Sequence, residues 1–563
     1  MEQHKIQDYI VSGKKPQGEN LDMTESIKLF WEQVGKKKSY WIPVLFFVIA
    51  SYGYSVFSRT IGIDDMASDL YVGSGHEMIS AGRWGMNVLT ALAAIPRPSP
   101  ASDRLLATAV LLLSGFMLSA LFFHIHHLPG EKQFIPKYTV LSCFLITYPI
   151  VGEIWEYTGA NYMSTGGMLI SIVSCIYIET REPVRIKDLL LVGALMTLPM
   201  SSYESGVLFY ITLVCSVLFY KYCIRQDQMK RSLYWKSALQ YVIPLIVALL
   251  LRLAIASLLR LSMGVAKGQT GETEITWGKG PISDVFRKLI IDTFLNYIVN
   301  GLVYLPITIF VIAEIFLIIF SIVLTIKNRN GMSLFGGLIL CVSVFTLTFI
   351  QGRFMQYRTA IPLSALTSFA AFSFMELFEG KKKNAIVIIN CLACYMLWVQ
   401  SAYLNSELAL NNQRSENEMR SMSILAQEIL STNPEKPVIF IGKHNSGEYF
   451  KHAKKEYSDT MAGVFYQKVI DAFKDRYGDY YYTFFHLTEF PDSNVNSSIN
   501  YSVTVEGMMH DYLAYLGYDI EVIDREREPE LLNKAYEIAR ATGMKPYEVQ
   551  EADDFIIASL LFW

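Results

Sequence analysis

The chain has 563 residues, of which 52% are hydrophobic and only 18% are charged. A soluble domain carries about 25% charged residues, so the composition argues against an ordinary soluble protein. The net charge is −3, but residues 404–563 hold 15 Lys/Arg and 26 Asp/Glu, a net of −11, while the remainder is basic at +8. Because the hydrophilic C-terminal part is acidic, we expect no nucleic-acid partner.

The N-terminal segment, residues 1–40, is polar and ends in Lys36, Lys37 and Lys38. The uncharged stretch Trp41–Ser58 follows directly. Lysines placed immediately before a first apolar span favour a cytoplasmic N-terminus. We therefore predict a cytoplasmic segment 1–40 that leads into the membrane.

Uncharged runs recur along the chain, and several reach the roughly 20 residues that cross a bilayer. We predict eleven spans, at about 41–58, 105–128, 137–152, 161–179, 188–200, 204–221, 236–260, 298–326, 332–350, 359–378 and 384–403. The fifth is short and ends at Pro199. The pattern predicts a mainly α, polytopic protein with a membrane domain at 41–403.

The short loops that this topology places inside are rich in Lys and Arg, for example Arg181, Arg185 and Lys381–Lys383. Positive charge in short inner loops supports the predicted orientation. The loop 59–104 and the whole segment 404–563 are then expected on the outer face. Two of the outer loops are long and hold most of the unusual residues, and loops are where membrane enzymes often hold their chemistry.

Two acids, Asp64 and Asp65, follow the first span in "IGIDDMASDLY". Either could cap the helix expected after them, because Asp is a preferred N-cap residue. Either could also serve as a general base. The sequence around them leaves both interpretations open.

Acids, arginines and aromatic residues recur in the other expected outer turns. They are Arg83 and Trp84 in "GRWG", Glu153, Trp155, Glu156 and Tyr157 in "GEIWEY", Tyr203 and Glu204 in "SSYESG", and Arg353, Tyr357 and Arg358 in "GRFMQYR". Carboxylates suit a hydroxyl, arginines suit phosphate oxygens, and ring faces suit the apolar side of a sugar. Aromatic residues are also common at a membrane interface without any ligand.

The paired acids after an apolar first span, the downstream "GRW", the "SSYESG" segment and the later "KPVIFIG" resemble GT-C fold glycosyltransferases. The sequence is most similar to the Gtr type II family of bacterial glucosyltransferases, which modify O-antigen and other cell-surface glycans. The resemblance implies an inverting transfer of a hexose from a polyprenyl-phosphate-sugar donor to a glycan acceptor outside a bacterial cytoplasmic membrane.

The resemblance also implies roles for these residues. Asp64 or Asp65 would be the general base, with Glu153 and Glu156 as second choices or as groups that orient the acceptor. Arg353 and Arg358, and less directly Arg83, would bind the donor phosphate. The remaining residues would contact substrate: Trp84, Trp155, Tyr157, Tyr203, Glu204 and Tyr357.

Metal binding is a secondary interpretation at two places. No cofactor is required, because a lipid phosphate leaves readily, although the paired acids could hold a divalent metal. "FFHIHHLPG" carries His124, His126 and His127, but no acid or cysteine cluster joins them locally. We therefore interpret them as interfacial histidines. Arg252 and Glu314 lie within expected spans, where charges are often functional, and Arg252 could touch a lipid phosphate.

The C-terminal segment, 404–563, is predicted to be a small α/β domain outside the membrane. "SMSILAQEIL" is helical in pattern, whereas "KPVIFIG" and "YDIEVID" are typical of strands. It carries no nucleotide fingerprint. A contact with the acceptor and a purely structural role are both open.

Two alternative functions remain at this stage. A transporter or flippase for a lipid-linked glycan would place polar groups and broken helices at the midplane, often in paired repeats, and no repeat is visible. A membrane polysaccharide polymerase would share the lipid-phosphate site. The membrane lipid, the lipid-linked donor and the glycan acceptor are the expected partners.

Overall fold

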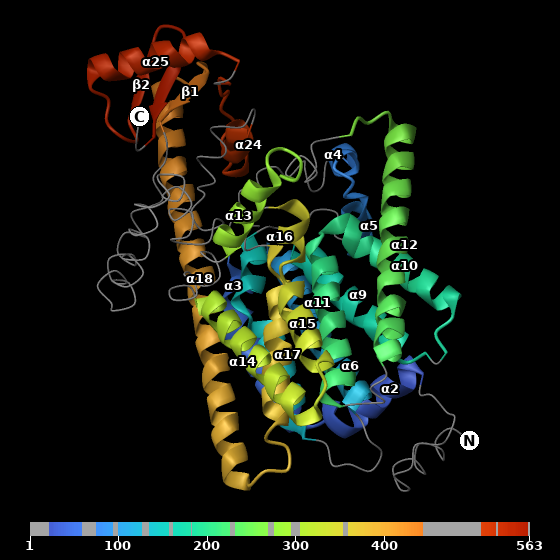
Figure 1. Ribbon diagram of the computed structural model, residues 1–563. Helices are drawn as coiled ribbons and strands as arrows, with labels where there is room; N and C mark the ends of the chain where they lie inside the picture. Colours follow the sequence, from blue (N-terminus) through green and yellow to red (C-terminus); the bar gives the residue numbers. More distant parts are fainter. Residues whose placement is uncertain are drawn as a thin grey trace.

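The computed structural model describes residues 22–58, 75–93, 100–126, 134–156, 161–181, 183–225, 231–267, 275–293, 305–352, 359–442, 508–524 and 527–560. Within these ranges, long helices form a bundle, and one helix extends beyond it to carry a small C-terminal unit with a β-sheet (Figure 1). The candidate site lies at the end of the bundle nearest that unit.

The first elements show how the sequence starts the bundle. Helix α2 (Met23–Phe30) begins at a capping box in which Asp22 and Glu25 each accept a hydrogen bond from the other's backbone N–H. A π-turn, η1 (Trp31–Gly35), leads to α3 (Lys38–Phe57), the first long apolar helix.

The other helices of the bundle follow in chain order. They are α4 (Gly75–Ser80), α5 (Trp84–Ala93), α6 (Pro100–His126), α7 (Ile135–Thr147), α8 (Pro149–Gly152), η4 (Glu153–Glu156), α9 (Asn161–Glu179), α10 (Ile186–Ser202), α11 (Ser205–Phe219), η5 (Tyr220–Ile224), α12 (Arg231–Met263), α13 (Ile282–Thr293), α14 (Leu305–Asn328), α15 (Met332–Ser343), α16 (Thr346–Gln351), α17 (Pro362–Glu376) and α18 (Lys383–Thr432).

Eight helices in the described part of the chain are long and apolar enough to cross a membrane, by length and composition. The described parts of the predicted spans fall mainly on helices, but those at 188–200, 332–350 and 359–378 correspond to shorter elements: α10 of 17 residues, α15 with α16, and α17 of 15 residues. The protein is therefore a mainly α, polytopic membrane protein, as the sequence predicted. The number eleven stays a prediction.

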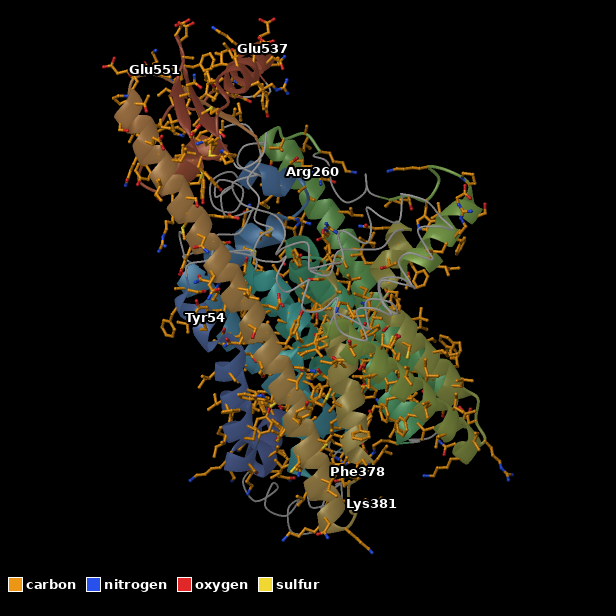
Figure 2. All side chains as sticks on the ribbon, turned by 90° about the vertical axis from the view of Figure 1, so that its left-hand side faces the viewer. Tyr54, Arg260, Phe378, Lys381, Glu537 and Glu551 are labelled. Atoms are coloured by element: carbon orange, nitrogen blue, oxygen red, sulfur yellow. The ribbon has the colours of Figure 1, made fainter. Side chains whose placement is uncertain are left out.

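The bundle has two distinct ends. The C-terminal unit, α4 and Arg260 lie near one of them, which we call the C-domain end, whereas Phe378 and Lys381 lie at the opposite end (Figures 1 and 2). Helix α2 also lies at the opposite end.

Polar side chains inside the bundle pair across helices. Ser142 of α7 bonds Tyr40 of α3 at 2.8 Å and Ser119 of α6 at 2.7 Å. Thr147 of α7 donates to the side chain of Gln400 of α18 at 2.8 Å. Hydrogen bonds of this kind hold helices together where lipid supplies no hydrophobic driving force between them.

Helix α18, 50 residues long, joins the bundle to the C-terminal unit. The part of α18 that lies within the bundle packs on α3, where the side chain of Asn405 donates to the Ala50 carbonyl at 2.9 Å. Leu408 still belongs to the bundle core, whereas Met422 belongs to the core of the C-terminal unit. The predicted domain boundary at 403/404 thus lies inside a continuous helix.

The C-terminal unit contains β1 (Val438–Ile441), β2 (Val549–Glu551) and β3 (Ile556–Ser559) in the order β1-β3-β2. Strand β1 is parallel to β3 and β2 is antiparallel to it. Alternate residues of β1 face different cores, one shared with α18 and α24 (Met508–Tyr515) and one with α25 (Pro529–Thr542).

The sequence predicted part of this unit. "KPVIFIG" is β1, as expected. The stretch "YDIEVID" forms only an isolated bridge, between Val522 and Val438. Strands β2 and β3, which complete the sheet, were not predicted.

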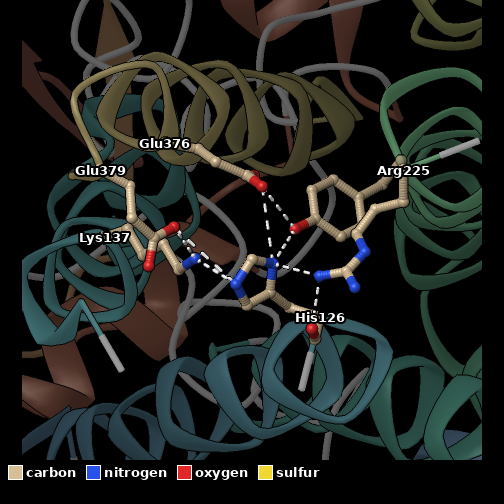
Figure 3. Close-up of polar contacts among 6 residues, drawn as sticks. His126, Lys137, Arg225, Glu376 and Glu379 are labelled. Atoms are coloured by element: carbon tan, nitrogen blue, oxygen red, sulfur yellow. Dashed lines mark hydrogen bonds and ion pairs between the residues drawn. The ribbon is translucent and has the colours of Figure 1, made fainter. Parts of the chain in front are cut away.

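A network of charged side chains joins four helices at the opposite end (Figure 3). Lys137 of α7, fully buried, lies 2.7 Å from both Nε2 of His126 and Oε2 of Glu379. On the other side of the imidazole, Nδ1 contacts the Tyr220 hydroxyl at 2.5 Å and Nη1 of Arg225 at 2.9 Å.

Glu376 of α17 completes this network and connects it to α11. Its Oε1 accepts a hydrogen bond from the Tyr220 hydroxyl at 2.9 Å and lies 3.5 Å from His126. The two glutamates offset the charges of Lys137 and Arg225 around His126.

The π-turn η5 explains why Tyr220 and Arg225 meet the same histidine. The Arg225 N–H donates to the Tyr220 carbonyl at 3.0 Å, five residues back. Positions five apart lie about 140° from each other around an α-helix, whereas an i→i+5 turn brings them to one side. The intervening Lys221 points elsewhere and pairs with Glu179 of α9 at 2.9 Å.

We predict that Lys137→Met lowers stability strongly, because it leaves Glu379 without its nearest cation in a half-buried place. Removing one partner of a buried ion pair costs about 3 kcal/mol or more. Thermal unfolding in detergent measures the effect, with Lys382→Met, an exposed lysine at the same end, as the matched control. Equal melting of the two variants would contradict a structural role for the network.

Candidate functional site

Four charged residues meet at the C-domain end, and we call them the Arg83 cluster: Arg83, Glu204, Arg252 and Arg260. Nη2 of Arg252 lies 3.0 Å from Oε1 of Glu204, and Nη2 of Arg83 lies 3.4 Å from Oε2 of the same carboxylate. An ideal Cβ at Gly82 would lie 3.1 Å from Nη2 of Arg260 and 4.0 Å from that of Arg252. Two guanidinium groups therefore share one carboxylate, while Arg260 lies beside Gly82 and donates to the Ile79 carbonyl at 3.1 Å.

Arg83 belongs to the "GRWG" segment, and its position depends on the close packing of Gly85, the second glycine of that segment, against α10. Gly85, at the start of α5, lies so close to α10 that a Cβ would stand 2.3 Å from Oγ of Ser201 and 2.9 Å from the Leu198 carbonyl. The end of α10 leads directly into Tyr203 and Glu204. Close contact between α5 and α10 thus brings Arg83 against Glu204.

Electrostatics keep Glu204 ionised. Burial alone would raise the pKa of its carboxyl, but Arg83 and Arg252 outweigh this and hold that pKa below its usual value. Among the described residues, Arg83 and Arg252 share this one carboxylate, which gives a formal charge of +1. The side chains of Arg83 and Glu204 are 42% and 36% exposed, so an anion could reach the guanidinium of Arg83.

The aromatic residues predicted beside the cluster are also found there. Trp84 follows Arg83 at the first position of α5, and its indole N–H is buried without a hydrogen-bond acceptor among the described residues. Tyr203 caps α10 and is partly buried. A buried donor left unpaired is rare in proteins and is consistent with a ligand that accepts its hydrogen bond.

Trp155 was predicted to contact substrate, but its side chain lies in the core of the bundle. It is fully buried and stacks on Tyr52 of α3, with ring centroids 4.5 Å apart. In this structure it supports the C-domain end of the core, and its ring is not open to a sugar.

Two charged residues that sequence reasoning missed lie in the same region. Arg104, at the start of α6, is buried and donates to the carbonyls of Ser55 and Ser58 at 3.0 Å each, and to the Ser58 hydroxyl at 2.8 Å. It thereby fixes the end of α3. Its neighbour Asp103 is fully buried and accepts a hydrogen bond from the amide of Asn161.

The signal for these two residues is present in the sequence. Asp103 and Arg104 are adjacent charges at the start of a long apolar run, where a charge must find partners as the helix enters the bundle. Arg104 anchors the chain six residues before Asp64, at Ser58.

Several predicted site residues lie outside the described residues. They are Asp64, Asp65, Tyr157, Arg353, Tyr357 and Arg358. The backbone of Glu153 and Glu156 forms η4, next to the start of α9, but their side chains are outside the described part of the structure.

The chain entering the Arg353 segment is nevertheless held firmly. The Thr276 backbone N–H and hydroxyl each donate to the Gln351 carbonyl at 2.9 Å, and the hydroxyl also reaches the Gly352 carbonyl at 2.8 Å. Nε1 of Trp277 donates to the Phe349 carbonyl at 2.7 Å. The loop before α13 therefore clamps the end of α16, one residue before Arg353.

Metal-ligand side chains gather away from this site. His126, Glu376 and Glu379 place donor atoms within 4.8 Å of one another. The acids that the sequence lacked near "HIHH" are thus supplied by α17 and the turn after it. Lys137 already lies between His126 and Glu379 at 2.7 Å from each, so an ammonium occupies the position that a metal would need, and the residues fit a charge-balanced network better than a metal site.

The fold and the site define a polytopic membrane protein with a cationic, partly exposed cluster at one end of its bundle. The family model described as glucosyl transferase GtrII matches residues 53–378, and the chain belongs to that family. The match includes the Arg83 cluster and stops before α18 and the C-terminal unit. Comparison with curated proteins and with solved structures gives no match.

We predict that Gly352→Ala impairs both stability and sugar transfer. Gly352 has φ +70°, and its Cβ would lie 2.4 Å from Oγ1 of Thr276 and 2.9 Å from Cγ1 of Val285, so the clamp must open. Gly278→Ala is the matched control, because φ is +81° there but the space is open. The left-handed backbone costs each alanine about 1 kcal/mol, and a larger loss is expected only at 352. Similar melting temperatures and transfer rates for both variants would show that the clamp is dispensable.

Proposed function

We propose that this glucosyltransferase moves a hexose, most simply glucose, from a polyprenyl-phosphate sugar to a glycan acceptor at the C-domain end of the bundle. The observation that carries the proposal is the Arg83 cluster. It offers an accessible excess of positive charge at the level where a lipid-borne phosphate would stand.

The cluster suits a phosphate for a geometric reason. Guanidinium groups offer paired donors that match phosphate oxygens. Glu204 orients Arg83 and Arg252 and prevents the arginines from repelling one another. Trp84, next to Arg83 in the chain, has an indole N–H without an acceptor among the described residues, and in this proposal it adds a donor. In this proposal Arg353 and Arg358, which follow the clamped end of α16, add further phosphate contacts.

The reaction needs a base and a stabilised leaving group. The acceptor oxygen attacks the anomeric carbon while its proton passes to a carboxylate, for which Asp64 or Asp65 is the candidate. The bond between that carbon and the phosphate oxygen breaks, and the electron pair leaves with the polyprenyl phosphate. The arginines stabilise the charge that develops there.

The proposal includes an orientation. The basic loops belong to the end that carries Lys381, which would be cytoplasmic. The C-domain end and residues 404–563 would then face outside, with residues 41–403 as the membrane domain. A membrane polysaccharide polymerase would use the same phosphate site with a longer donor, and donors of one sugar and of many distinguish the two.

We predict that Arg252→Ala weakens use of polyprenyl-phosphate glucose by about 10-fold to 100-fold, because a hydrogen bond to a charged group contributes about 1.5–3 kcal/mol. Arg252→Lys should restore only part of this, since the fork geometry is lost. The measurement is release of polyprenyl phosphate by purified protein in nanodiscs. Arg540→Ala, an exposed arginine of α25, is the control, and equal donor kinetics for it and Arg252→Ala would remove the cluster from the donor site.

We also predict that Asp64→Asn or Asp65→Asn lowers the transfer rate by about 10²–10⁴-fold while the protein stays folded. Asn caps a helix about as well as Asp, so a role in capping alone predicts normal transfer in both variants. Thermal stability and transfer are measured together. Normal transfer by both would shift the search for the base to Glu153 and Glu156.

A further inference from the structure

Helix α13, between α12 and α14, has an apolar face, and only part of this face packs against the rest of the protein. Val285 and Leu289 are 8% and 2% exposed and pack inward. Ile282, Phe286 and Ile290, spaced four residues apart, are 65%, 48% and 65% exposed. The sequence analysis placed no helix here.

The two apolar rows form one continuous surface on the helix. On a wheel of 100° per residue, the five residues cover an arc of about 140°. Asp284 and Arg287 lie on the remaining side and are exposed. Most amphipathic helices of a globular protein turn the whole apolar arc inward, whereas α13 turns one edge of it out.

The exposed row is continuous with surfaces that face lipid in a spanning bundle. Helix α16, to which the α13 segment is clamped, exposes Phe349 and Ile350 at 45% and 55%. Trp277 joins the two, since its N–H bonds the Phe349 carbonyl and its ring meets Phe286 edge to face at 5.2 Å. Tryptophan at such a position is typical of the membrane–water boundary.

We propose that α13 lies along the membrane surface at the C-domain end, with Ile282, Phe286 and Ile290 inserted at the boundary between headgroups and acyl chains. The partner is the lipid bilayer itself. Apolar residues on one side and charged residues on the other are what a helix in that plane requires. Arg287 suits the anionic headgroups of an acidic phospholipid.

This arrangement gives the clamp on α16 a further consequence. Thr276 and Trp277 tie the end of α16 to the same segment that α13 anchors. Gly352 packs against Val285 of α13, because a Cβ at Gly352 would lie only 2.9 Å from Cγ1 of Val285. A membrane-bound α13 therefore fixes the depth at which the chain leaves α16 toward Arg353. The inference about α13 stands whether or not that segment binds a donor.

The test measures what surrounds single positions of α13 in a bilayer. Cys391 and Cys394, the exposed cysteines of the described chain, are first replaced by alanine. Phe286→Cys, Ile290→Cys and, on the polar side, Asp284→Cys are each spin-labelled in nanodiscs of phosphatidylethanolamine and phosphatidylglycerol. Collision with oxygen reports contact with acyl chains, and collision with a water-soluble nickel chelate reports contact with water.

Labels at 286 and 290 are expected to collide more with oxygen than with the nickel chelate, and the label at 284 is expected to show the reverse. Equal nickel accessibility at all three positions would mean that the row faces water and would overturn the proposal. Low accessibility of 286 and 290 to both reagents would mean that protein covers the row, and would overturn it equally. Melting temperature and transfer of the labelled proteins, compared with the cysteine-free background, show that each remains folded.

Discussion

The arrangement of this protein depends on keeping charged side chains out of contact with lipid. The bundle is apolar along most of its length, so its arginines, lysines and acids can be accommodated only where they meet a partner or reach the surface. In the described part of the chain two groups of them lie at the two ends of the bundle, whereas Glu314 lies within α14. At one end, Lys137 and Arg225 are balanced by Glu376 and Glu379 around His126. At the other, Arg83 and Arg252 share a single glutamate, Glu204.

The difference between the two ends separates structure from function. The network around His126 is balanced in charge and largely buried, and its contacts connect α6, α7, η5 and α17. It therefore stabilises the packing of the bundle at that end. The Arg83 cluster has an excess of positive charge and is partly exposed. An unbalanced cation group is costly for a fold but useful for binding an anion, which is the reason for placing the donor phosphate there and not at the opposite end.

The candidate site depends on backbone supports that carry no chemistry themselves. Gly85 lets α5 approach α10 closely enough for Arg83 to reach Glu204. Arg104 holds the end of α3 shortly before the paired acids. Thr276 holds the end of α16 directly before Arg353. Each of these contacts fixes the chain at the point where a predicted site segment begins, so the reactive segments start from rigid helix ends even though they are distant in sequence.

The sequence by itself determined the class of the protein, because long uncharged runs have one stable solution in a membrane and their ends are marked by charge. It also marked Arg83, Trp84, Tyr203 and Glu204 as candidates, since charged and aromatic residues at helix ends stand out against apolar surroundings. Only the tertiary structure decided which of them meet. Arg252 approaches Glu204 across 48 residues, Glu379 approaches Lys137 across 242, and Trp155 turns inward onto Tyr52. Strands β2 and β3 were not predicted, and only the structure shows that they pair with each other and with β1. Local pattern records which residues are unusual, but pairing between distant segments depends on how helices pack, and that information is not carried by any one stretch of the chain.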